Sequence, residues 1–575
     1  MRRRLLLLLG GVLGLVLVVV SWASFRATQV KGDLLQARVL ADRVQLQLTA
    51  GDIDLAVAGL PPLRSALDRA AGRSHGPAWR LSSQVPVVGG NFRAVRRVAL
   101  AAELLGKDAL PEAAQALDVA RRERVMADGR VDLAVLARIG GHVRVAELAA
   151  ERARVLVDSP QPLLVPPVGA GLDQARTTVR RLADALESAR STLALAPGLL
   201  GQSRPRSYYV AIQNNAEARA TGGLVAGFAL LSTDRGRVIL DHSGTDSEFH
   251  VAARPVPTDP EMADVYRSLG SDRAWHAANL TPHFPDAARN LAGMWQAQSG
   301  QRIEVVLAID PIVMSELLRV TGPVRLADGL QVSADSVRDF VWREEYVRYP
   351  DPQARKLVLS GLSRDIFARV IATKDPVKLL QAFIRIGQSG HFFAWSADER
   401  EQAVLAAHSS GGVLPQTDVP YLSVLTQNIG GNKLDYYLRR TVRVRPADGG
   451  FLRVDVTLRN TTPLGLPDYV TVRSDRPDPP LPYGQAKSLF TIYGAMSSEI
   501  SRVELDGKPA QMAFDRDHGH RMGTFVIEVP RGKDVTVSVL ISQPSGQLQY
   551  RQQPLVRPDR LDVSGSRFLG EATGH

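Results

Sequence analysis

Apolar and polar positions follow a different pattern in each successive part of the chain. Residues 5–25 are apolar or uncharged throughout, and Met1-Arg-Arg-Arg4 precedes them. At about 1.5 Å per residue, a helix of this length spans roughly 30 Å, the thickness of one bilayer core. Arginines in front of such a span hold the N-terminus in the cytoplasm. The pattern predicts that residues 1–25 form cytoplasmic arginines and a transmembrane anchor, with the rest of the chain outside the membrane.

A cleaved signal peptide is the alternative for this segment. Ser21-Trp22-Ala23 has the small-x-small form of a cleavage site. The apolar run is longer than the core of an ordinary signal peptide, and helix-forming sequence follows it at once. These two features favour a retained signal anchor, which makes the protein a single-pass protein of the cell membrane whose bulk is extracytoplasmic.

Residues 26–200 carry apolar side chains near the spacing of a helix. The helical pattern breaks at Gly51-Asp52, at the proline- and glycine-rich stretch 79–90 and again at 160–171. Pro197-Gly198 ends the last helix. We therefore expect an extracytoplasmic helical region over residues 26–200. Its alanine and arginine content indicates helix packing and shows no catalytic chemistry.

Between residues 205 and 430, short apolar runs alternate with helical ones. Tyr208–Ile212, Leu224–Leu231 and Ile303–Ile309 have the length and composition of buried strands. Helices are predicted over 312–320, 334–345 and 351–372. Strands that alternate with helices predict an α/β domain in which helices cover both faces of a sheet.

From Leu434 the pattern changes to a period of two. Val442 and Val444 alternate with arginines, and similar short strands, among them Tyr469–Val472, recur after turn signals. This spacing predicts an immunoglobulin-like β-sandwich over residues 434–542. Residues 543–575 contain prolines and arginines and are predicted to form a mobile tail. The arginine row of the first strand, formed by Arg439, Arg443 and Arg445, is either an anion-binding face or a solvated strand face.

Composition narrows the classes of function. The chain has 575 residues, which is too long for one core, and its 45% apolar and 22% charged content is ordinary for folded protein. The net charge of +11 is spread along the chain, and no basic tract contains interleaved aromatics, so nucleic acid is not an expected partner. There is no cysteine, which excludes disulfides, thiolate metal sites and a cysteine nucleophile.

The candidate site is the polar hinge between the first two predicted strands of the α/β domain. A hinge of this kind places amides, a carboxylate and a guanidinium where two buried strands meet, which is a common location for binding sites. Its closing glycines allow close backbone approach or a positive φ. The alternative is a hairpin whose polar groups only satisfy the backbone. The hinge residues are Asn214, Asn215, Glu217, Arg219, Thr221, Gly222 and Gly223.

Several motifs resemble those of a bacterial family of membrane-anchored envelope proteins, common in actinobacteria and known as domain of unknown function 4012. The motifs are Gln213–Gly223, Ile309-Asp-Pro311, Thr321-Gly-Pro323, Asn432–Tyr437 and the break Val85–Gly90. The likeness covers most of the chain after the anchor. It implies an architecture without implying an activity.

The order of elements from residue 208 to 372 is also similar to the LytR–CpsA–Psr family. Its membrane-anchored enzymes transfer glycopolymers from a polyprenyl-pyrophosphate carrier to the cell wall. Arg219-Ala-Thr221 resembles the arginine motif of that family's first strand pair, and Arg343…Asp351…Arg355 resembles its late arginine-rich helix. The arginine-aspartate pair of the family is replaced by His242-Ser-Gly-Thr-Asp246. The resemblance therefore implies a glycopolymer phosphotransferase with an incomplete phosphate clamp.

A pyrophosphate site needs guanidinium donors, often together with a divalent metal held by carboxylates. Arg219, Arg343 and Arg355 could supply the donors. Glu217, Asp246 and Asp310 could supply the carboxylates, although none lies in a recognised metal-ligand spacing, and no catalytic residue is identified. The structural alternatives are a buried ion pair for Arg219, a surface position for Arg343 and Arg355, and a strand-end cap for Asp310.

Two functions follow from these observations. In the first, the protein binds or assembles an anionic lipid-linked glycopolymer at the membrane, with a polyprenyl-pyrophosphate-linked glycan or a cell-wall polymer as partner. In the second, it is a non-catalytic envelope scaffold that uses the β-sandwich for interaction. A deep apolar groove ending at Arg219 would favour the first function, and a filled core would favour the second.

Overall fold

The computed structural model describes residues 26–564 except for positions 27, 45, 48–51, 75–76, 86–88, 124, 161–163, 374–375 and 476–481. The predicted anchor over residues 1–25 lies outside the described residues. Within the described ranges, no helix is both long and apolar enough to cross a membrane. Contacts divide the chain into two compact units, the first ending at Ser203 and including Pro376–Gln381, and the second formed by Arg204–Asp375 and the residues from Ala382 onward.

The first unit is helical, as its periodicity predicts. Residues 28–44 are helical before the first labelled element. The elements that follow are α2 (Ile53–Arg73), α3 (Pro77–Ser82), α4 (Gly89–Leu104), the π-helical turn η1 (Leu105–Ala109), α5 (Leu110–Arg122), β1 (Met126–Ala127), β2 (Arg130–Val131), α6 (Leu133–Asp158) and α7 (Pro166–Leu199). The last helix starts within the stretch expected to be a connection and continues through Pro197.

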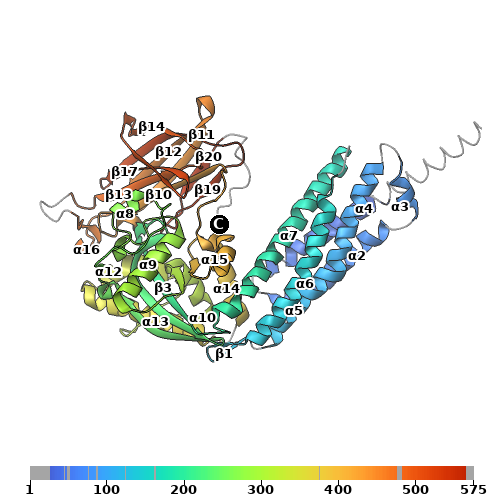
Figure 1. Cartoon of the computed structure of the whole chain (residues 1–575), viewed down its shortest axis with the longest axis horizontal. Coiled ribbons are helices and arrows are strands. Elements are labelled where there is room, and N and C mark those ends of the chain that lie inside the picture. The colour runs from blue at the N-terminus through green and yellow to red at the C-terminus, as the bar shows by residue number, and fades with distance from the viewer. Residues whose placement is uncertain are drawn as a thin grey trace, which may run out of the picture. The chain divides into compact units, whose positions relative to one another are not determined.

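Small side chains allow the helices of this unit to pack closely. Helices α4, α6 and α7 lie side by side (Figure 1). Ala94 and Ala101 of α4 lie in one buried cluster with Ala153 of α6 and with Leu172 and Val179 of α7. A buried alanine leaves little side-chain bulk between two helix backbones, so the apolar stripes of neighbouring helices meet directly.

The second unit begins with a mixed sheet in the order β5-β4-β3-β6-β9. Its strands are β3 (Arg206–Arg219), β4 (Gly222–Asp234), β5 (Arg237–Thr245), β6 (Val305–Ile309) and β9 (Phe393–Ser396). β3 and β6 are parallel, whereas β3–β4, β4–β5 and β6–β9 are antiparallel.

Helices and loops cover both faces of this sheet. Tyr209 on one face lies in a buried cluster with Phe284 and Leu291 of α9 (Phe284–Ser299). Val210 and Val305 point to the opposite face and are also buried. On the sheet, α13 (Pro352–Ile371) contacts β5, and α10 (Pro311–Thr321) contacts β6. This part of the chain is therefore a mixed α and β arrangement, with one parallel and three antiparallel strand pairs.

Short elements connect these parts. They are η2 (Asp246–Glu248), α8 (Asp264–Ser268), η3 (Trp275–Ala277), β7 (Val324–Arg325), β8 (Gln331–Val332), α11 (Val337–Asp339), the π-helical turn η4 (Phe340–Glu344), α12 (Glu345–Arg348), α14 (Pro376–Gln388), α15 (Glu399–Ala406) and η5 (Ser409–Gly411). The single helix expected over 334–345 is thus divided by the π-helical turn.

The C-terminal part consists of two sheets that pack face to face (Figure 1). The five-stranded sheet has the order β16 (Ala513–Asp517), β17 (His520–Val529), β13 (Ala486–Tyr493), β10 (Tyr421–Asn428) and β19 (Gln549–Arg551). The six-stranded sheet has the order β15 (Lys508–Pro509), β14 (Ile500–Leu505), β18 (Asp534–Ser542), β12 (Phe451–Asn460), β11 (Leu438–Pro446) and β20 (Arg560–Val563). Between the strands lie η6 (Leu434–Tyr436), η7 (Asp448–Gly450) and α16 (Asp468–Thr471).

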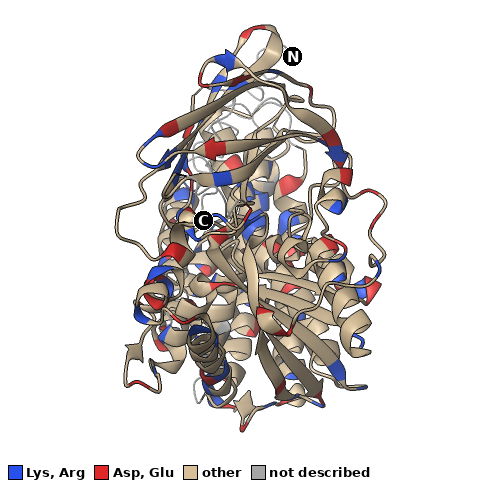
Figure 2. Ribbon diagram, turned by 90° about the vertical axis from the view of Figure 1, so that its left-hand side faces the viewer, with Lys and Arg blue, Asp and Glu red and all other residues tan. Residues whose placement is uncertain are grey.

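Two features of this part differ from the expectation. Tyr469–Val472, expected as a strand, falls mainly in the short helix α16, which follows Pro467. The sandwich also includes β10, which lies before residue 434, and β19 and β20, which lie in the predicted tail. The chain is therefore a mixed α and β protein with a helical N-terminal region and a β-rich C-terminal part. Lys, Arg, Asp and Glu are interspersed over its ribbons (Figure 2).

Candidate functional site

The predicted hinge is the bulged end of a β-hairpin. β3 continues to Arg219 and β4 begins at Gly222, with shifts in register between Ile212 and Gln213 and between Asn214 and Ala218. A Cβ atom on Gly223 would lie 2.0 Å from the carbonyl carbon and oxygen of Asn214, so no larger residue fits there. The bulge lets the strand pair carry additional polar residues without breaking the sheet.

Arg219 is buried, and other parts of the protein accept its hydrogen bonds. Its Nε donates to the His276 carbonyl at 2.8 Å, and its Nη1 donates to the carbonyls of Asn428 at 2.7 Å and Ala218 at 3.0 Å. Its Nη2 donates to Glu217 at 3.1 Å, and the side chain is 6% exposed. The guanidinium therefore links the hairpin to β10 of the sandwich.

A second cation completes this ion-pair network. Lys433 donates to the other oxygen of Glu217 and is itself buried. Burial alone would raise the pKa of Glu217, but the charges of Lys433 and Arg219 outweigh burial and hold the pKa below its usual value. Glu217 is thus an ionised carboxylate between two cations.

The amide side chains of the hinge are also bonded to distant segments. Asn214 donates to the Tyr346 hydroxyl at 2.8 Å. Asn215 donates to Asp310 and to the Pro554 carbonyl, both at 2.9 Å. The Thr221 hydroxyl accepts from Gln213 and from Asn279, both at 3.2 Å.

Burial raises the pKa of two further carboxyl groups beside this network. Asp435 accepts from the Asn428 amide at 2.7 Å and from the Ala218 backbone at 3.2 Å, and burial raises its pKa to about 6. Burial raises the pKa of Glu345 to about 8. Ionised carboxylates are costly to bury, so both groups mark a solvent-excluded region.

The three remaining candidate residues lie in different environments. Asp310 caps α10, accepting from the backbone amides of Ile312 and Val313 at 2.9 and 3.2 Å, and also lies 2.5 Å from His391 Nδ1.

Arg343 is exposed beside Glu344, whereas Arg355 is 3% exposed with its guanidinium 4.0 Å from the centre of the Tyr469 ring. Arg355 is therefore a buried cation stacked on an aromatic ring, and the surface alternative fits Arg343 alone.

The carboxylates considered for a divalent metal are bonded to different groups. Glu217 is paired with two cations, Asp310 serves as a helix cap, and Asp246 lies 2.9 Å from Lys356. In the structure, Glu217 and Asp246 are therefore ion-pair partners, and Asp310 is a helix cap.

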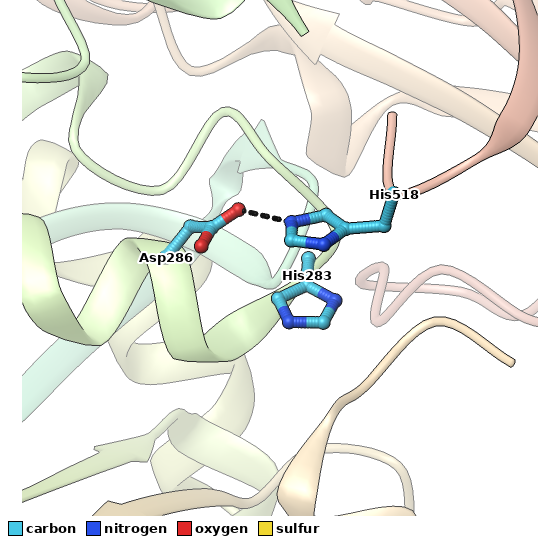
Figure 3. A group of neighbouring side chains, drawn as sticks. All are labelled: His283, Asp286 and His518. Atoms are coloured by element: carbon cyan, nitrogen blue, oxygen red, sulfur yellow. Dashed lines mark hydrogen bonds and ion pairs between the residues drawn. The ribbon is translucent and has the colours of Figure 1, made fainter. Parts of the chain in front are cut away.

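A different group, His283, Asp286 and His518, is the one in the described residues whose ligand atoms lie close enough to share a metal ion. The imidazoles of His283 and His518 are stacked, with ring centroids 3.7 Å apart and planes inclined by 13°. Figure 3 shows these two rings together with Asp286. Nitrogen lone pairs lie in the ring planes, so stacked rings do not direct them at one ion at the distance of about 2 Å that zinc requires.

The contacts of this group explain it as an ion pair. His518 Nε2 lies 2.7 Å from Asp286, and His518 Nδ1 lies 3.4 Å from Glu261. Burial opposes protonation of His518, but Asp286 outweighs it and raises the pKa. Burial and the adjacent His518 lower the pKa of His283 to about 2, and its Nδ1 accepts from the Leu414 amide at 3.3 Å. The group joins α9 to the turn between β16 and β17.

A small cavity of about 180 Å³ lies near the hinge. His276, whose carbonyl accepts from Arg219, contributes to its wall, and Phe249 stacks on Trp275 with ring centres 4.2 Å apart. The lining residues are Leu224, Val225, Asp246, Phe249, Val251, Trp275 and His276. The cavity is mainly apolar with one carboxylate at its edge.

Sequence reasoning identified the hairpin half of this network and missed the other half. Asn428, Lys433 and Asp435 come from β10 and the turn after it, and Gln553 donates to the Arg219 carbonyl at 3.0 Å from the C-terminal segment. The motif Asn432–Tyr437 drew attention only as part of a family likeness. Its clustering of polar groups beside aromatics was the available signal.

Residues 203–346 match the model of a family described as a protein of unknown function (DUF4012). The matched span contains every hinge residue, Asp310 and Arg343, and it ends before Arg355 and the sandwich. No curated protein and no solved structure matches the chain.

Proposed function

We propose that the chain is a membrane-anchored, extracytoplasmic protein of the cell envelope that acts as a non-catalytic scaffold. In this proposal the hinge is a structural joint that fixes the β-sandwich on the α/β sheet. The main support for this proposal comes from the contacts of Arg219. Its guanidinium makes four hydrogen bonds within the protein, and its side chain is 6% exposed.

A phosphate-binding arginine must present its planar fork to a ligand. Arg219 instead directs its donors to three backbone carbonyls and to Glu217. Removing it would leave Glu217 buried with Lys433 as its remaining cation, a change that costs roughly 3–5 kcal/mol in comparable buried pairs. These contacts support a contribution to stability rather than to turnover.

The test compares Arg219→Lys and Arg219→Ala by melting temperature and by affinity for a polyprenyl-pyrophosphate analogue. We expect both variants to have a lower melting temperature than the wild type, because neither lysine nor alanine can reproduce the forked contacts. We also expect no specific binding of the analogue to the wild-type chain. Arg343→Lys is the control, since Arg343 is exposed and its ion-pair partner, Glu344, is an adjacent surface residue. An Arg219→Lys protein that melts like the wild type but loses measurable analogue binding would overturn the proposal.

The location is tested separately by adding protease to intact, wall-stripped cells. The apolar run over residues 5–25 and the arginines at 2–4 support an outward-facing C-terminus. Digestion of the β-sandwich is the expected result. Full protection of the sandwich in intact cells, with digestion after lysis, would contradict this topology.

A second candidate function is the binding or transfer of an anionic lipid-linked glycopolymer, as the likeness to the LytR–CpsA–Psr family implies. The apolar cavity beside His276 favours it, because an apolar wall next to the hinge could hold part of a polyprenyl chain. The test is Val251→Trp, since Val251 is 69% exposed at the cavity and tryptophan would fill it. This function requires that the wild-type chain binds the analogue and that Val251→Trp binds it more weakly.

A further inference from the structure

A second cavity of about 180 Å³ lies where the turn after α11 meets the start of the sandwich. Its wall includes the π-helical turn η4, an irregularity that often occurs at functional sites. The lining residues are Asp335, Arg338, Asp339, Trp342, Tyr436, Val556 and Arg557. Its charged and aromatic lining distinguishes it from the apolar cavity beside His276.

The hinge of the α/β domain supports the floor of this cavity. Trp342 and Val556 pack against Ala216, which lies between the two polar residues Asn215 and Glu217. Asn215 accepts from Trp342 Nε1 at 3.4 Å and donates to the carbonyl of Pro554 at 2.9 Å. The bulge in β3 thus determines where the two apolar walls of the cavity lie.

Arg338 and Arg557 line the cavity, and Arg439 lies next to it; among the described residues none of the three has a carboxylate partner. Arg439 Nη1 donates to the Tyr436 carbonyl at 3.2 Å, and Arg557 Nη1 donates to the same oxygen. Among the described residues, neither Arg439 nor Arg557 forms an ion pair, and the guanidinium of Arg338, which also lines the cavity, makes no hydrogen bond. Burial lowers the pKa of Arg439, and the nearby charge of Arg557 lowers it further. These guanidinium groups retain donors for an added oxyanion.

The cavity lining also contains acceptors. Asp339 accepts from the Tyr436 hydroxyl at 3.0 Å, and Asp335 is exposed at the cavity wall. Carboxylates accept hydrogen bonds from hydroxyl groups, and aromatic side chains provide apolar surface for C–H groups. The volume lies below the roughly 300–1,000 Å³ of sites for drug-sized ligands, which suits a single ring.

We propose that this cavity binds one sugar residue that carries a phosphate or carboxylate group. Arg338 and Arg557 hold the oxyanion, and Asp335 and Asp339 accept from the sugar hydroxyls. The inference rests on the lining of this cavity and does not depend on where the protein is located or on whether the hinge is a structural joint.

The experiment is calorimetric titration of the full chain in detergent with glucose 6-phosphate, glucuronate, glucose and inorganic phosphate. We expect at least one of the two anionic sugars to bind in the millimolar range or tighter. Glucose and inorganic phosphate should each bind at least tenfold more weakly, since each offers half of the required groups. The pair of anionic sugars also distinguishes phosphate from carboxylate as the preferred oxyanion.

Substitutions of residues that line the cavity test whether the sugar binds there. Arg338→Gln should weaken binding of the preferred sugar at least tenfold while leaving the melting temperature unchanged, because Arg338 is exposed. Asp335→Asn should weaken sugar binding without changing phosphate binding. Arg443→Gln is the matched control, since Arg443 lies on β11 beside Asp562, with 3.8 Å between their charged groups.

Three outcomes would overturn the proposal. The first is that neither anionic sugar binds. The second is that glucose or inorganic phosphate binds as tightly as the anionic sugars. The third is that Arg338→Gln and Arg557→Gln, if both fold, bind like the wild type.

Discussion

The side-chain amide of Asn215 donates to the carbonyl oxygen of Pro554 at 2.9 Å, although 339 positions separate the two residues along the chain. A similar long-range contact joins Gln553 to the backbone of Arg219. The hairpin of the α/β sheet is thus bonded directly to the C-terminal segment. Because these groups are buried, breaking the contacts would leave polar atoms without partners.

We expect truncation after residue 547 to abolish the cooperative melting of the second unit. The truncation removes β19, β20 and Asp559, whose carboxylate accepts from the buried Arg440 at 2.9 Å. An unpaired buried arginine is strongly destabilising. Calorimetry and circular dichroism measure the effect, and truncation after residue 564 is the control. Wild-type melting of the shorter protein would show that the C-terminal strands are dispensable.

The fragment 434–542 should fail to fold alone, although its alternating pattern predicts a separate sandwich. It lacks β10, which pairs with β13 over six residues and contributes Leu422 and Val424 to the core. We expect a fragment of residues 415–564 to be better structured, because it contains all strands of both sheets. Dispersed amide spectra and a cooperative melt of the 434–542 fragment would contradict this expectation.

Gly223→Ala should be strongly destabilising, by about 3 kcal/mol or more, because the added methyl group meets rigid backbone atoms at 2.0 Å. Gly361→Ala in α13 is the matched control, since its nearest non-bonded atom is 3.8 Å away at the end of Arg364. Alanine at that helical position should be neutral or slightly stabilising. Urea denaturation of both variants gives the comparison, and equal midpoints would argue against the tight hairpin.

Glu345→Gln should stabilise the second unit at neutral pH. Burial raises the Glu345 pKa from 4.5 to about 8, so the folded state binds a proton that the unfolded state releases. Stability from this group is therefore complete below pH 4.5 and falls as the pH rises toward 8. At 1.36 kcal/mol per pKa unit, the loss at pH 7 is about 3 kcal/mol. Urea midpoints of the variant and the wild type at pH 5 and pH 8 test this prediction. If the difference between the two midpoints is no larger at pH 8 than at pH 5, the pKa of Glu345 is not raised.

His518→Asn should destabilise the protein more at pH 6 than at pH 9. The pKa of His518 is raised above 6.5 by Asp286, so its contribution is fully present below 6.5 and is lost as the pH rises through the folded value. Asparagine keeps the positive φ of 47° at this position. Arg516→Gln is the control, since Arg516 lies two positions earlier in β16 and is exposed. If the variant lowers the stability by the same amount at both pH values, His518 is neutral in the folded protein.

Periodicity predicted the elements whose burial is one-sided. The helices of the first unit present one apolar stripe, and β11 alternates buried Val442 and Val444 with exposed Arg443. β10 has no such alternation, because both of its faces are covered and all eight of its residues are buried. Periodicity alone does not assign a strand of this kind to a sheet, which is why β10 was not predicted as part of the sandwich.

The candidate site was predictable as a cluster of polar residues but not as a buried one. The burial of the Arg219–Glu217 pair depends on Asn428, which accepts from Arg219, and on Lys433, which donates to Glu217; both lie more than two hundred positions away. A single sequence gives no direct information about such pairings. The same limit applies to Arg355, whose burial depends on Tyr469. Whether these residues also contact a ligand stays a prediction.

The parallel pairing of β19 with β10 and of β20 with β11 determines when the sandwich can close. Both late strands cover an edge that would otherwise be open to pairing with other chains. A ribosome makes β19 and β20 after every other strand of the sandwich, so the edges of β10 and β11 stay unpaired until synthesis has passed Val563. A copy that ends before Gln549 keeps those edges exposed to proteases and to aggregation. The architecture therefore makes closure of the sandwich conditional on synthesis through Val563, so that shorter copies are open to degradation.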